Sequence, residues 1–413
     1  MAQRHAEPWH TDQFFSSLWN YLPEVTGGFA FPQELKIHDI TLRDGEQQAG
    51  VVLNADDKVR IAEALADAGV HRIEAGLPAV SAADEEAVRR IAALGLPSEI
   101  YAFCRCTTSD VRLAADCGVK SVVMEVPASG HLIEKAYGWT KEKALDLTIE
   151  ATAYAHELGL KVVFFPIDAT RSPMVELMDD LGKVAREGHA DAIVLVDTMG
   201  VISPHAVGFF VRSTRERLGI PLETHFHQDF GLGVANTLIA ATQGAEVLHT
   251  TVAGIGERSG NTPMEETVMA LLTMYGIDMG IKTEKFYELS RLVLGLTGVV
   301  QAPNKPVIGD SLFHIESGIP TAWLRKLGEE EMLEVFPYRP GLVGQPAPRT
   351  VLGKGNGLDS IAFGLERIGM KWSSTEELRV ILADVKAVSL EKKRLLTDDE
   401  FAVIARKTLP VTG

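Results

Sequence analysis

Short apolar runs alternate with longer amphipathic stretches from about residue 35 to residue 275. Eight of these runs have strand length, and they lie at 35–39, 71–75, 99–103, 121–126, 161–165, 192–197, 222–227 and 247–252. The stretches between them, such as 57–68 and 141–158, repeat apolar residues with the spacing of an amphipathic helix. Short buried strands that alternate with helices predict a parallel sheet. Eight such units predict a (β/α)8 TIM barrel, with a doubly wound open sheet as the alternative.

The pattern changes after residue 285, where prolines interrupt the apolar runs. Helical spacing returns only at 360–368 and 375–391. We therefore expect a TIM-barrel catalytic domain at 35–285, followed at 286–413 by a linker and mostly helical C-terminal subdomains. Residues 1–34 contain aromatic side chains in a polar context, and we expect them to form an N-terminal arm that packs on the barrel or on a partner subunit.

Composition narrows the classes of partner. The net charge of −16 argues against nucleic acid and against an anionic membrane surface. No apolar run is long enough to span a bilayer, and the first residues lack the apolar region of a signal peptide. The three cysteines do not have zinc-ribbon spacing, so buried free thiols in a reducing cytoplasm are expected.

Two short motifs place metal-competent side chains where predicted strands end. Residues 41–47 (TLRDGEQ) follow the first strand, and residues 224–229 (THFHQD) end the seventh. Side chains alternate along a strand, so His225 and His227 point to the same face. Together with Asp44 they make a plausible divalent-metal site, and Arg43 can hold an anion beside that metal.

Polar residues also follow the other strands, as the barrel prediction requires, because TIM-barrel active sites lie at the C-terminal ends of the strands. The further residues in such positions are Glu74, Arg105, Ser129, His131, Asp168, Arg171, Thr198, Glu257, Arg258 and Asn261. Five of them have a simpler alternative: Glu74 as a residue that only orients Arg43 or neighbouring backbone, Arg105 and Arg171 as scaffold ion pairs, and Ser129 and Thr198 as turn residues.

At these motifs the sequence resembles the 2-isopropylmalate synthase and homocitrate synthase family, within the DRE-TIM metallolyases. The matching segments are 41–47 (TLRDGEQ), 197–200 (DTMG), 225–229 (HFHQD), 254–261 (GIGERSGN) and 352–355 (LGKG), and the resemblance covers about residues 35–400. It implies a metal-dependent Claisen-type condensation of an acyl-CoA, with acetyl-CoA expected, and a 2-oxo acid.

The resemblance also implies roles for individual residues. Asp44, His225 and His227 would bind Mg²⁺, Mn²⁺ or Zn²⁺, with Asn261 nearby or coordinated. Arg43, supported by Glu74, would stabilise the developing alkoxide. Residues expected to hold substrate are Gln47, Arg105, Ser129, Arg171 and Thr198. The family also implies a homodimer in which the post-barrel region reaches the neighbouring active site.

The proton-transfer residues of the family are replaced in this sequence. The usual Glu after the fifth strand corresponds to Ile167, the usual His to Pro320 and the usual Tyr to Val335. The general base is therefore open, with His314, Glu316, Tyr338 and His131 as candidates. Three functions remain: a carbon–carbon bond-forming acyltransferase, a metal-dependent lyase or aldolase acting on a related hydroxy acid, and a non-catalytic ligand-binding homologue.

Overall fold

The computed structural model describes residues 7–409. Eight parallel strands form a closed barrel in which each strand pairs with the next along the chain and β8 pairs with β1. The TIM-barrel prediction is therefore confirmed, and the open sheet is excluded. The strands are β1 (Lys36–Asp39), β2 (Arg72–Glu74), β3 (Glu99–Arg105), β4 (Ser121–Pro127), β5 (Lys161–Ile167), β6 (Ala192–Asp197), β7 (Leu222–Phe226) and β8 (Val247–Thr250).

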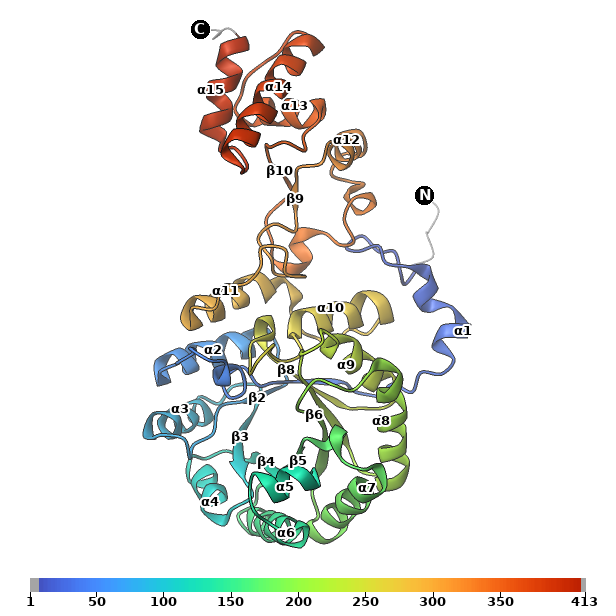
Figure 1. Cartoon of the computed structure of the whole chain (residues 1–413), viewed down its shortest axis with the longest axis vertical. Helices are drawn as coiled ribbons and strands as arrows, with labels where there is room; N and C mark the ends of the chain where they lie inside the picture. Colours follow the sequence, from blue (N-terminus) through green and yellow to red (C-terminus); the bar gives the residue numbers. More distant parts are fainter. Residues whose placement is uncertain (1–6, 410–413) are drawn as a thin grey trace. The chain divides into compact units, whose positions relative to one another are not determined.

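Helices surround the strands, as Figure 1 shows for the ring formed by α2 to α9. The helices of this part of the chain are α1 (Pro23–Thr26), α2 (Ala55–Asp67), α3 (Ala82–Ala93), α4 (Thr108–Asp116), α5 (Gly130–Lys135), α6 (Lys141–Glu157), α7 (Met174–Lys183), α8 (Pro204–Leu218), α9 (Gly233–Thr242), α10 (Met264–Tyr275) and α11 (Phe286–Thr297).

Local sequence explains how these helices begin and which face they bury. Helix α2 starts at Asn54, whose side chain accepts from the backbone N–H of Asp57, and the Asp57 carboxylate accepts from the Asn54 backbone in return. Such a reciprocal cap satisfies two N–H groups that the first turn leaves unpaired. Ile61 and Leu65, one turn apart, are fully buried, so the helix packs one apolar face inward.

The barrel interior has an apolar sector and a polar sector. Strands β3 to β6 fill their sector with a cluster that includes Phe103, Val123, Phe165 and Val194. Strands β7, β8, β1 and β2 instead place buried charged or ionisable side chains inside, namely Glu223, His225, His249, His38 and Glu74. The polar sector leads to the ends of β1 and β7, where the sequence motifs lie.

Contacts divide the described chain into two compact units, with Leu18–Val300 in one and residues 7–17 together with 301–409 in the other. The second unit holds a small parallel sheet of β9 (His314–Ile315) and β10 (Arg349–Thr350). Its helices are α12 (Gly318–Leu327), α13 (Leu358–Arg367), α14 (Thr375–Lys392) and α15 (Asp398–Thr408). The C-terminal region is thus helical as expected, although the sequence patterns identified only α13 and α14.

A separate apolar core stabilises this C-terminal unit. Ile361, Leu365, Ile381, Val385 and Phe401 are fully buried in one cluster supplied by α13, α14 and α15. Burying a side chain of this size contributes roughly 1.5–3 kcal/mol. Among residues 7–409 no helix is long and apolar enough to cross a membrane, and all three cysteines are buried free thiols, as expected.

Candidate functional site

The ends of β1 and β7 bring Asp44, His225 and His227 together. The Nε2 atom of His225 lies 3.6 Å from Asp44 Oδ2, and the Nε2 atom of His227 lies 3.6 Å from Asp44 Oδ1. One possible ligand atom from each residue lies within 4.8 Å of the others. All three side chains are almost fully buried. Residues separated by almost two hundred positions therefore meet at the mouth of the barrel.

The chemistry of this group fits a divalent metal. Both ring nitrogens of His225 and of His227 are buried and have no hydrogen-bond partner among the described residues, and buried polar atoms without a partner are costly. Burial holds the pKa of His225 well below its usual value, so its imidazole is neutral. Burial favours a neutral Asp44, but Arg43 and the two imidazoles outweigh it and hold the Asp44 pKa well below its usual range. Two imidazoles and an ionised carboxylate are a common donor set for divalent transition metals.

Asn261 completes the surroundings of Asp44. Its Nδ2 atom donates to Asp44 Oδ1 at 2.7 Å and to the Ile255 carbonyl at 3.2 Å, whereas its Oδ1 atom is buried without a partner among the described residues. The glycine-rich motif before it has a steric purpose. A Cβ atom at Gly256, where φ is +151°, would lie 2.2 Å from Asn261 Nδ2, so this approach requires glycine.

Arg43 is held rigidly beside this group. Its Nε atom donates to Glu74, and its Nη1 atom donates to Asp44 Oδ2 at 2.6 Å and to Gln47 Oε1 at 3.2 Å. The guanidinium lies 3.8 Å from the centre of the Phe103 ring. Its Nη2 atom has no partner among the described residues. One guanidinium nitrogen thus remains available beside the three possible metal ligands.

A cavity of about 140 Å³ opens over these side chains. Its walls combine the polar group with apolar residues from the neighbouring strands. The lining residues are Arg43, Asp44, Gln47, Leu77, Phe103, Glu125, Phe165, Ile167, Thr198, His225, His227 and Glu257. Gln47 and Thr198, expected from the sequence to bind substrate, lie in this cavity.

Arg105 and Arg171 do not line the cavity. Arg105 forms a two-point ion pair with Asp110, at 2.7 and 2.9 Å, and Arg171 forms one with Asp168, at 2.6 and 2.9 Å. Both side chains are substantially exposed. In this structure each arginine is paired with a carboxylate nearby in the sequence, Asp110 at the start of α4 for Arg105 and Asp168 just after β5 for Arg171.

Near the end of β5, Asp168 contacts other polar residues that the sequence placed after the strands. The Ser129 hydroxyl donates to Asp168 Oδ2 at 2.6 Å, and His131 Nε2 lies 3.2 Å from the same oxygen. The Asp168 N–H donates to the Thr198 hydroxyl at 2.8 Å. Ser129 and His131 therefore lie in a network centred on Asp168, outside the cavity lining.

The candidate proton-transfer residues His314, Glu316 and Tyr338 lie in the C-terminal unit. His314 is exposed on β9. Glu316 accepts from the Gly355 N–H at 2.8 Å and so fixes the loop of the LGKG motif. The Tyr338 backbone forms an isolated bridge with Phe14. Of the positions where this chain departs from the family pattern, Ile167 lines the barrel cavity, whereas Pro320 and Val335 belong to the C-terminal unit.

A second group of possible metal ligands lies deeper in the barrel, but its geometry differs. His38, Glu223 and His249 are fully buried and have ligand atoms within 4.8 Å of one another. However, Glu223 Oε2 lies only 2.8 Å from His249 Nε2, and Glu223 Oε1 accepts from Arg72 at 2.7 Å. Both are hydrogen-bond distances, so the two oxygens of the Glu223 carboxylate already have partners. We therefore assign this group to the packing of the polar sector.

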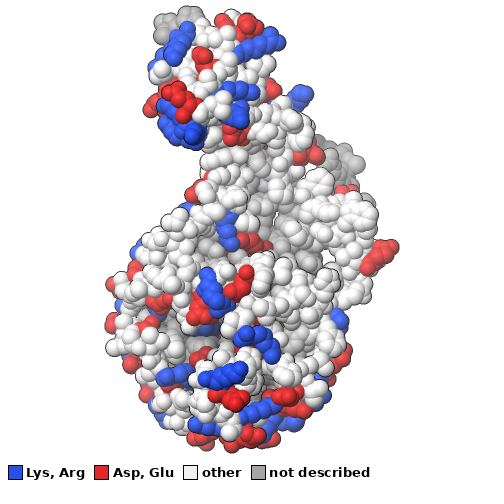
Figure 2. Space-filling view, viewed as in Figure 1, with Lys and Arg blue, Asp and Glu red and all other residues white. Residues whose placement is uncertain are grey.

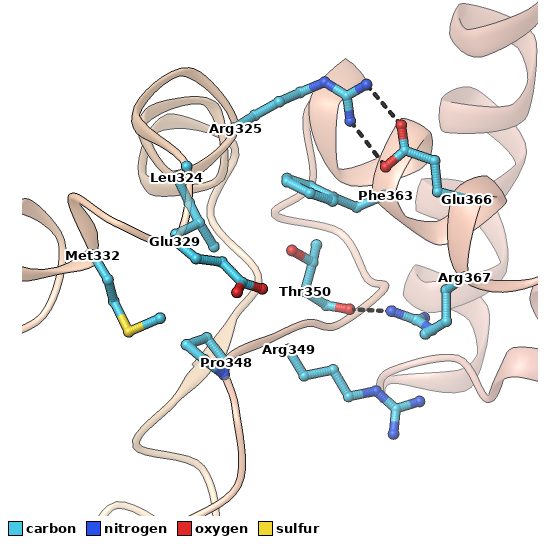
Figure 3. A pocket seen from close by; sticks show the side chains of 11 residues that line it. Leu324, Arg325, Glu329, Met332, Pro348, Arg349, Thr350, Phe363, Glu366 and Arg367 are labelled. Carbon is cyan, nitrogen blue, oxygen red and sulfur yellow. Dashed lines mark hydrogen bonds and ion pairs between the residues drawn. The ribbon is translucent and has the colours of Figure 1, made fainter. Parts of the chain in front are cut away.

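A larger cavity, about 610 Å³ in volume, lies within the C-terminal unit. Figure 3 shows it between α12, β10 and α13, with apolar side chains and three arginines on its walls. The arginines are already paired: Arg325 with Glu366 at 2.8 Å, and Arg349 and Arg367 with Asp398 at 2.8 and 2.7 Å. The lining of this cavity contains none of Arg43, Asp44, His225 and His227, so size alone does not identify the site.

Sequence reasoning did not select several residues of the barrel cavity. Phe103, Phe165 and Leu77 form its apolar wall, and Glu125 adds a carboxylate from β4. The signal for Glu125 was available, since it is the only charged residue in the apolar strand 121–127. Its position in the alternation places it on the same face as Val123, which is buried in the interior cluster.

Comparison with known proteins agrees with this site. A profile for proteins described as HMGL-like matches residues 34–293. A homocitrate synthase from Methanopyrus kandleri is 38% identical over 393 residues, which cover 95% of this chain and 97% of the relative. A 2-isopropylmalate synthase from Methanocaldococcus jannaschii is 36% identical and is matched over 90% of this chain and 71% of its own length. A protein from Archaeoglobus fulgidus with the provisional name (R)-citramalate synthase is 40% identical, over 92% of this chain and 76% of the relative.

Solved structures agree on the fold of the barrel. A hydroxymethylglutaryl-CoA lyase from Bacillus subtilis superposes with a TM-score of 0.60 at 19% identity, covering 65% of this chain and 95% of the lyase. The match in sequence profile and the extensive identity to named synthases together establish the relationship. The chain belongs to the HMGL-like family.

Proposed function

We propose that this protein condenses an acyl-CoA, with acetyl-CoA expected, with a 2-oxo acid and releases free CoA. The observation that carries the proposal is the arrangement of Arg43 beside Asp44, His225 and His227 in one buried cavity. The relatives described above are named as homocitrate, 2-isopropylmalate and citramalate synthases, which agrees with an acyltransferase of this type.

In this proposal Asp44, His225 and His227 hold a divalent metal, with Asn261 adjacent. The metal, when bound, would supply Lewis-acid polarisation of a keto group. Arg43 stabilises the negative charge that develops on the keto oxygen, because Glu74 and Asp44 fix its orientation and its Nη2 atom has no partner among residues 7–409. Such preorganised charge needs no rearrangement during the reaction.

Gln47 and Thr198 are proposed to bind the substrate carboxylate inside the cavity. A substrate-binding role for Arg105, Arg171 or Ser129 would require each to exchange its present carboxylate partner for the substrate. An Arg–carboxylate pair can exchange in this way because both partners present the same two-point geometry.

The proposal includes a homodimer in the cytoplasm, in which the C-terminal unit of one subunit serves the barrel of its partner. His314, Glu316 and Tyr338 would then supply proton transfers that follow carbon–carbon bond formation. Residues 7–17 cluster with residues 301–409, so this part of the N-terminal arm would accompany the C-terminal unit, whereas residues 18–34 belong to the barrel unit.

The decisive experiment measures thiol release from acetyl-CoA with a panel of 2-oxo acids in the presence of Mg²⁺, Mn²⁺ or Zn²⁺. We expect release that depends on both the metal and one of the 2-oxo acids. The alternative is a carbon–carbon lyase, because the barrel also resembles the fold of hydroxymethylglutaryl-CoA lyases. Cleavage of a hydroxy acid or its CoA ester, without thiol release in the condensation assay, would replace our proposal with that one.

A further inference from the structure

Glu125 faces the barrel cavity from the middle of the apolar sector. In the parallel register of the sheet it lies between Arg105 of β3 and Phe165 of β5. It lines the same cavity as Arg43 and Asp44. It therefore borders the space that a substrate held by Arg43 would occupy.

Among residues 7–409, no hydrogen bond or ion pair is found for the Glu125 carboxylate. The neighbouring carboxylates are all committed. Glu74 binds Arg43, and Asp44 binds both Arg43 and Asn261. Glu257, at the rim, has a side chain that is 48% exposed and lies 3.3 Å from Arg258. Glu125 is thus the carboxylate of the cavity that is available to a ligand.

The surroundings of Glu125 suit proton transfer. Phe103, Phe165, Leu77 and Ile167 make an apolar wall in the same cluster. Burial raises the pKa of Glu125 above its usual value, although Arg43 and Arg105 oppose the rise, and Glu74 and Asp110 add to it. A carboxylate with a raised pKa is a better base at neutral pH than an exposed carboxylate with its usual pKa.

We propose that Glu125 is the general base that removes a proton from the acyl-CoA carbon next to the thioester carbonyl. The proton passes to a carboxylate oxygen of Glu125, and the electron pair of the broken C–H bond forms the new bond to the keto carbon of the 2-oxo acid. The carbonyl π electrons move to the keto oxygen, where Arg43 stabilises the resulting alkoxide. Water then cleaves the thioester and CoA leaves as the thiol. The inference rests on the proposed condensation activity.

The test compares Glu125→Gln and Glu125→Asp with wild type in the full-length, metal-loaded protein. Glu125→Gln keeps the shape of the side chain but cannot accept the proton, so we expect kcat to fall by about 10²–10⁴-fold. KM for the 2-oxo acid and the metal content should stay within about twofold, since these depend on other residues. Glu157→Gln is the control, an exposed carboxylate on α6 outside the cavity lining that should change kcat by less than about threefold.

Acetyl-CoA with a trideuterated methyl group distinguishes a general base from a residue that only supports the structure. Glu125→Asp retains a carboxylate at the wrong distance, so proton removal should become slower and the primary deuterium isotope effect on kcat should rise above that of wild type. A Glu125→Gln enzyme within threefold of wild type would overturn the proposal. So would a slow Glu125→Asp enzyme with an unchanged isotope effect. Wild type that releases no thiol would instead count against the proposed condensation itself, before any variant is compared.

Discussion

The barrel and the C-terminal unit use charged residues in opposite ways. Residues 301–413 carry 15 Lys and Arg against 15 Asp and Glu, so the net charge of −16 resides in residues 1–300. Acidic and basic side chains are interspersed on the surface that Figure 2 shows. The important difference is inside. The barrel buries ionisable groups in its core, whereas the pairs of the C-terminal unit, such as Arg325–Glu366, are substantially exposed.

The buried groups of the barrel form a nearly continuous series. Arg72 contacts Glu223, Glu223 contacts His249, and the His249 ring stacks on His38 with centroids 4.4 Å apart. His38 Nε2 lies 3.5 Å from Glu74, which holds Arg43. Buried charges are costly unless they are paired, and in this series each group packs against the next until Glu74 holds Arg43 at the barrel mouth. The following experiments test this contrast in order of decreasing effect on turnover.

The largest effect is expected from the possible metal ligands. His225→Ala or His227→Ala should remove the bound metal and lower turnover by at least about 10³-fold, because Lewis-acid stabilisation contributes several kcal/mol. Metal analysis and thiol release together measure this. His314→Ala, in the C-terminal unit, is the matched histidine control and should leave the metal content unchanged. A His227→Ala protein that keeps both metal and activity would contradict the assignment.

Removing the C-terminal unit tests whether the barrel is sufficient. A chain that ends at Val300 should keep its metal, since Asp44, His225 and His227 are all present. It should lose the dimer and about 10²–10³-fold of turnover, because the later proton-transfer groups are absent. Circular dichroism of the truncated chain checks that the barrel still folds.

Light scattering and thiol release measure the two outcomes of that truncation. A full-length protein that is monomeric at working concentration would rule out the exchange of C-terminal units between subunits. Full activity of the truncated chain would show that the barrel supplies every proton-transfer group itself.

Arg43→Lys should lower turnover by about 10²-fold while the fold and the metal are retained. Lysine keeps the charge but cannot bind Glu74, Asp44 and a substrate oxygen in one plane. The stacking of the guanidinium on Phe103 would also be lost. Steady-state kinetics are the measurement, with circular dichroism and metal content as controls. A lysine variant with wild-type kcat would show that charge alone suffices.

These residues also show how far sequence could lead. The eight strands were predictable because each is a short apolar run between helical segments, and the motifs at 41–47 and 225–229 identified the residues that meet at the barrel mouth. The partners of individual arginines were not predictable. Whether Arg105 faces substrate or Asp110 depends on side-chain rotamers that strand position does not fix.

The C-terminal unit was harder to predict for a related reason. Its prolines interrupt the periodic pattern, and α15 contributes Phe401 to a core that forms only when α13 and α14 are already packed. Local propensity is weak evidence when tertiary contacts decide the structure. Glu125 was not predictable from position after a strand, since it lies within β4, and its role depends on the cavity walls contributed by β3 and β5.

The buried groups of β1 should make the stability of the barrel depend on pH in two opposite ways. Burial raises the pKa of Asp39 to about 7 from 3.8. The folded state therefore binds more protons than the unfolded state between these values, and the contribution of Asp39 is lost as pH rises through about 7. Asp39→Asn mimics the protonated acid. Wild type loses this contribution and the Asp39→Asn variant does not. The free energy of unfolding of the variant, relative to that of wild type, should therefore rise by roughly 2–3 kcal/mol between pH 5 and pH 8.

His38, the adjacent residue, provides the opposite control. Burial lowers its pKa from 6.5 to about 4, so the folded state binds fewer protons in this range and the contribution of the neutral ring is lost as pH falls from 6.5 towards 4. The free energy of unfolding of His38→Gln relative to wild type should therefore rise as the pH falls. Urea unfolding at a series of pH values measures both variants. Parallel slopes for the two would contradict the assigned protonation states.

The smallest effects on turnover, and the most direct test of the contrast between the units, come from a matched pair of glutamate variants. Glu223→Gln replaces a fully buried carboxylate that faces Arg72 and His249 at 2.7 and 2.8 Å, and it leaves Arg72 with only the partly exposed Glu99 as a counter-ion, 3.2 Å away. It should lower the free energy of unfolding by about 3–5 kcal/mol. Glu366→Gln breaks the pair with Arg325, in which the glutamate side chain is 47% exposed, and should cost about 0–1 kcal/mol. Added salt should reduce the loss of stability in the Glu366→Gln variant further, because exposed ion pairs are screened. Equal losses for the two variants would show that burial does not distinguish the charges of the barrel from those of the C-terminal unit.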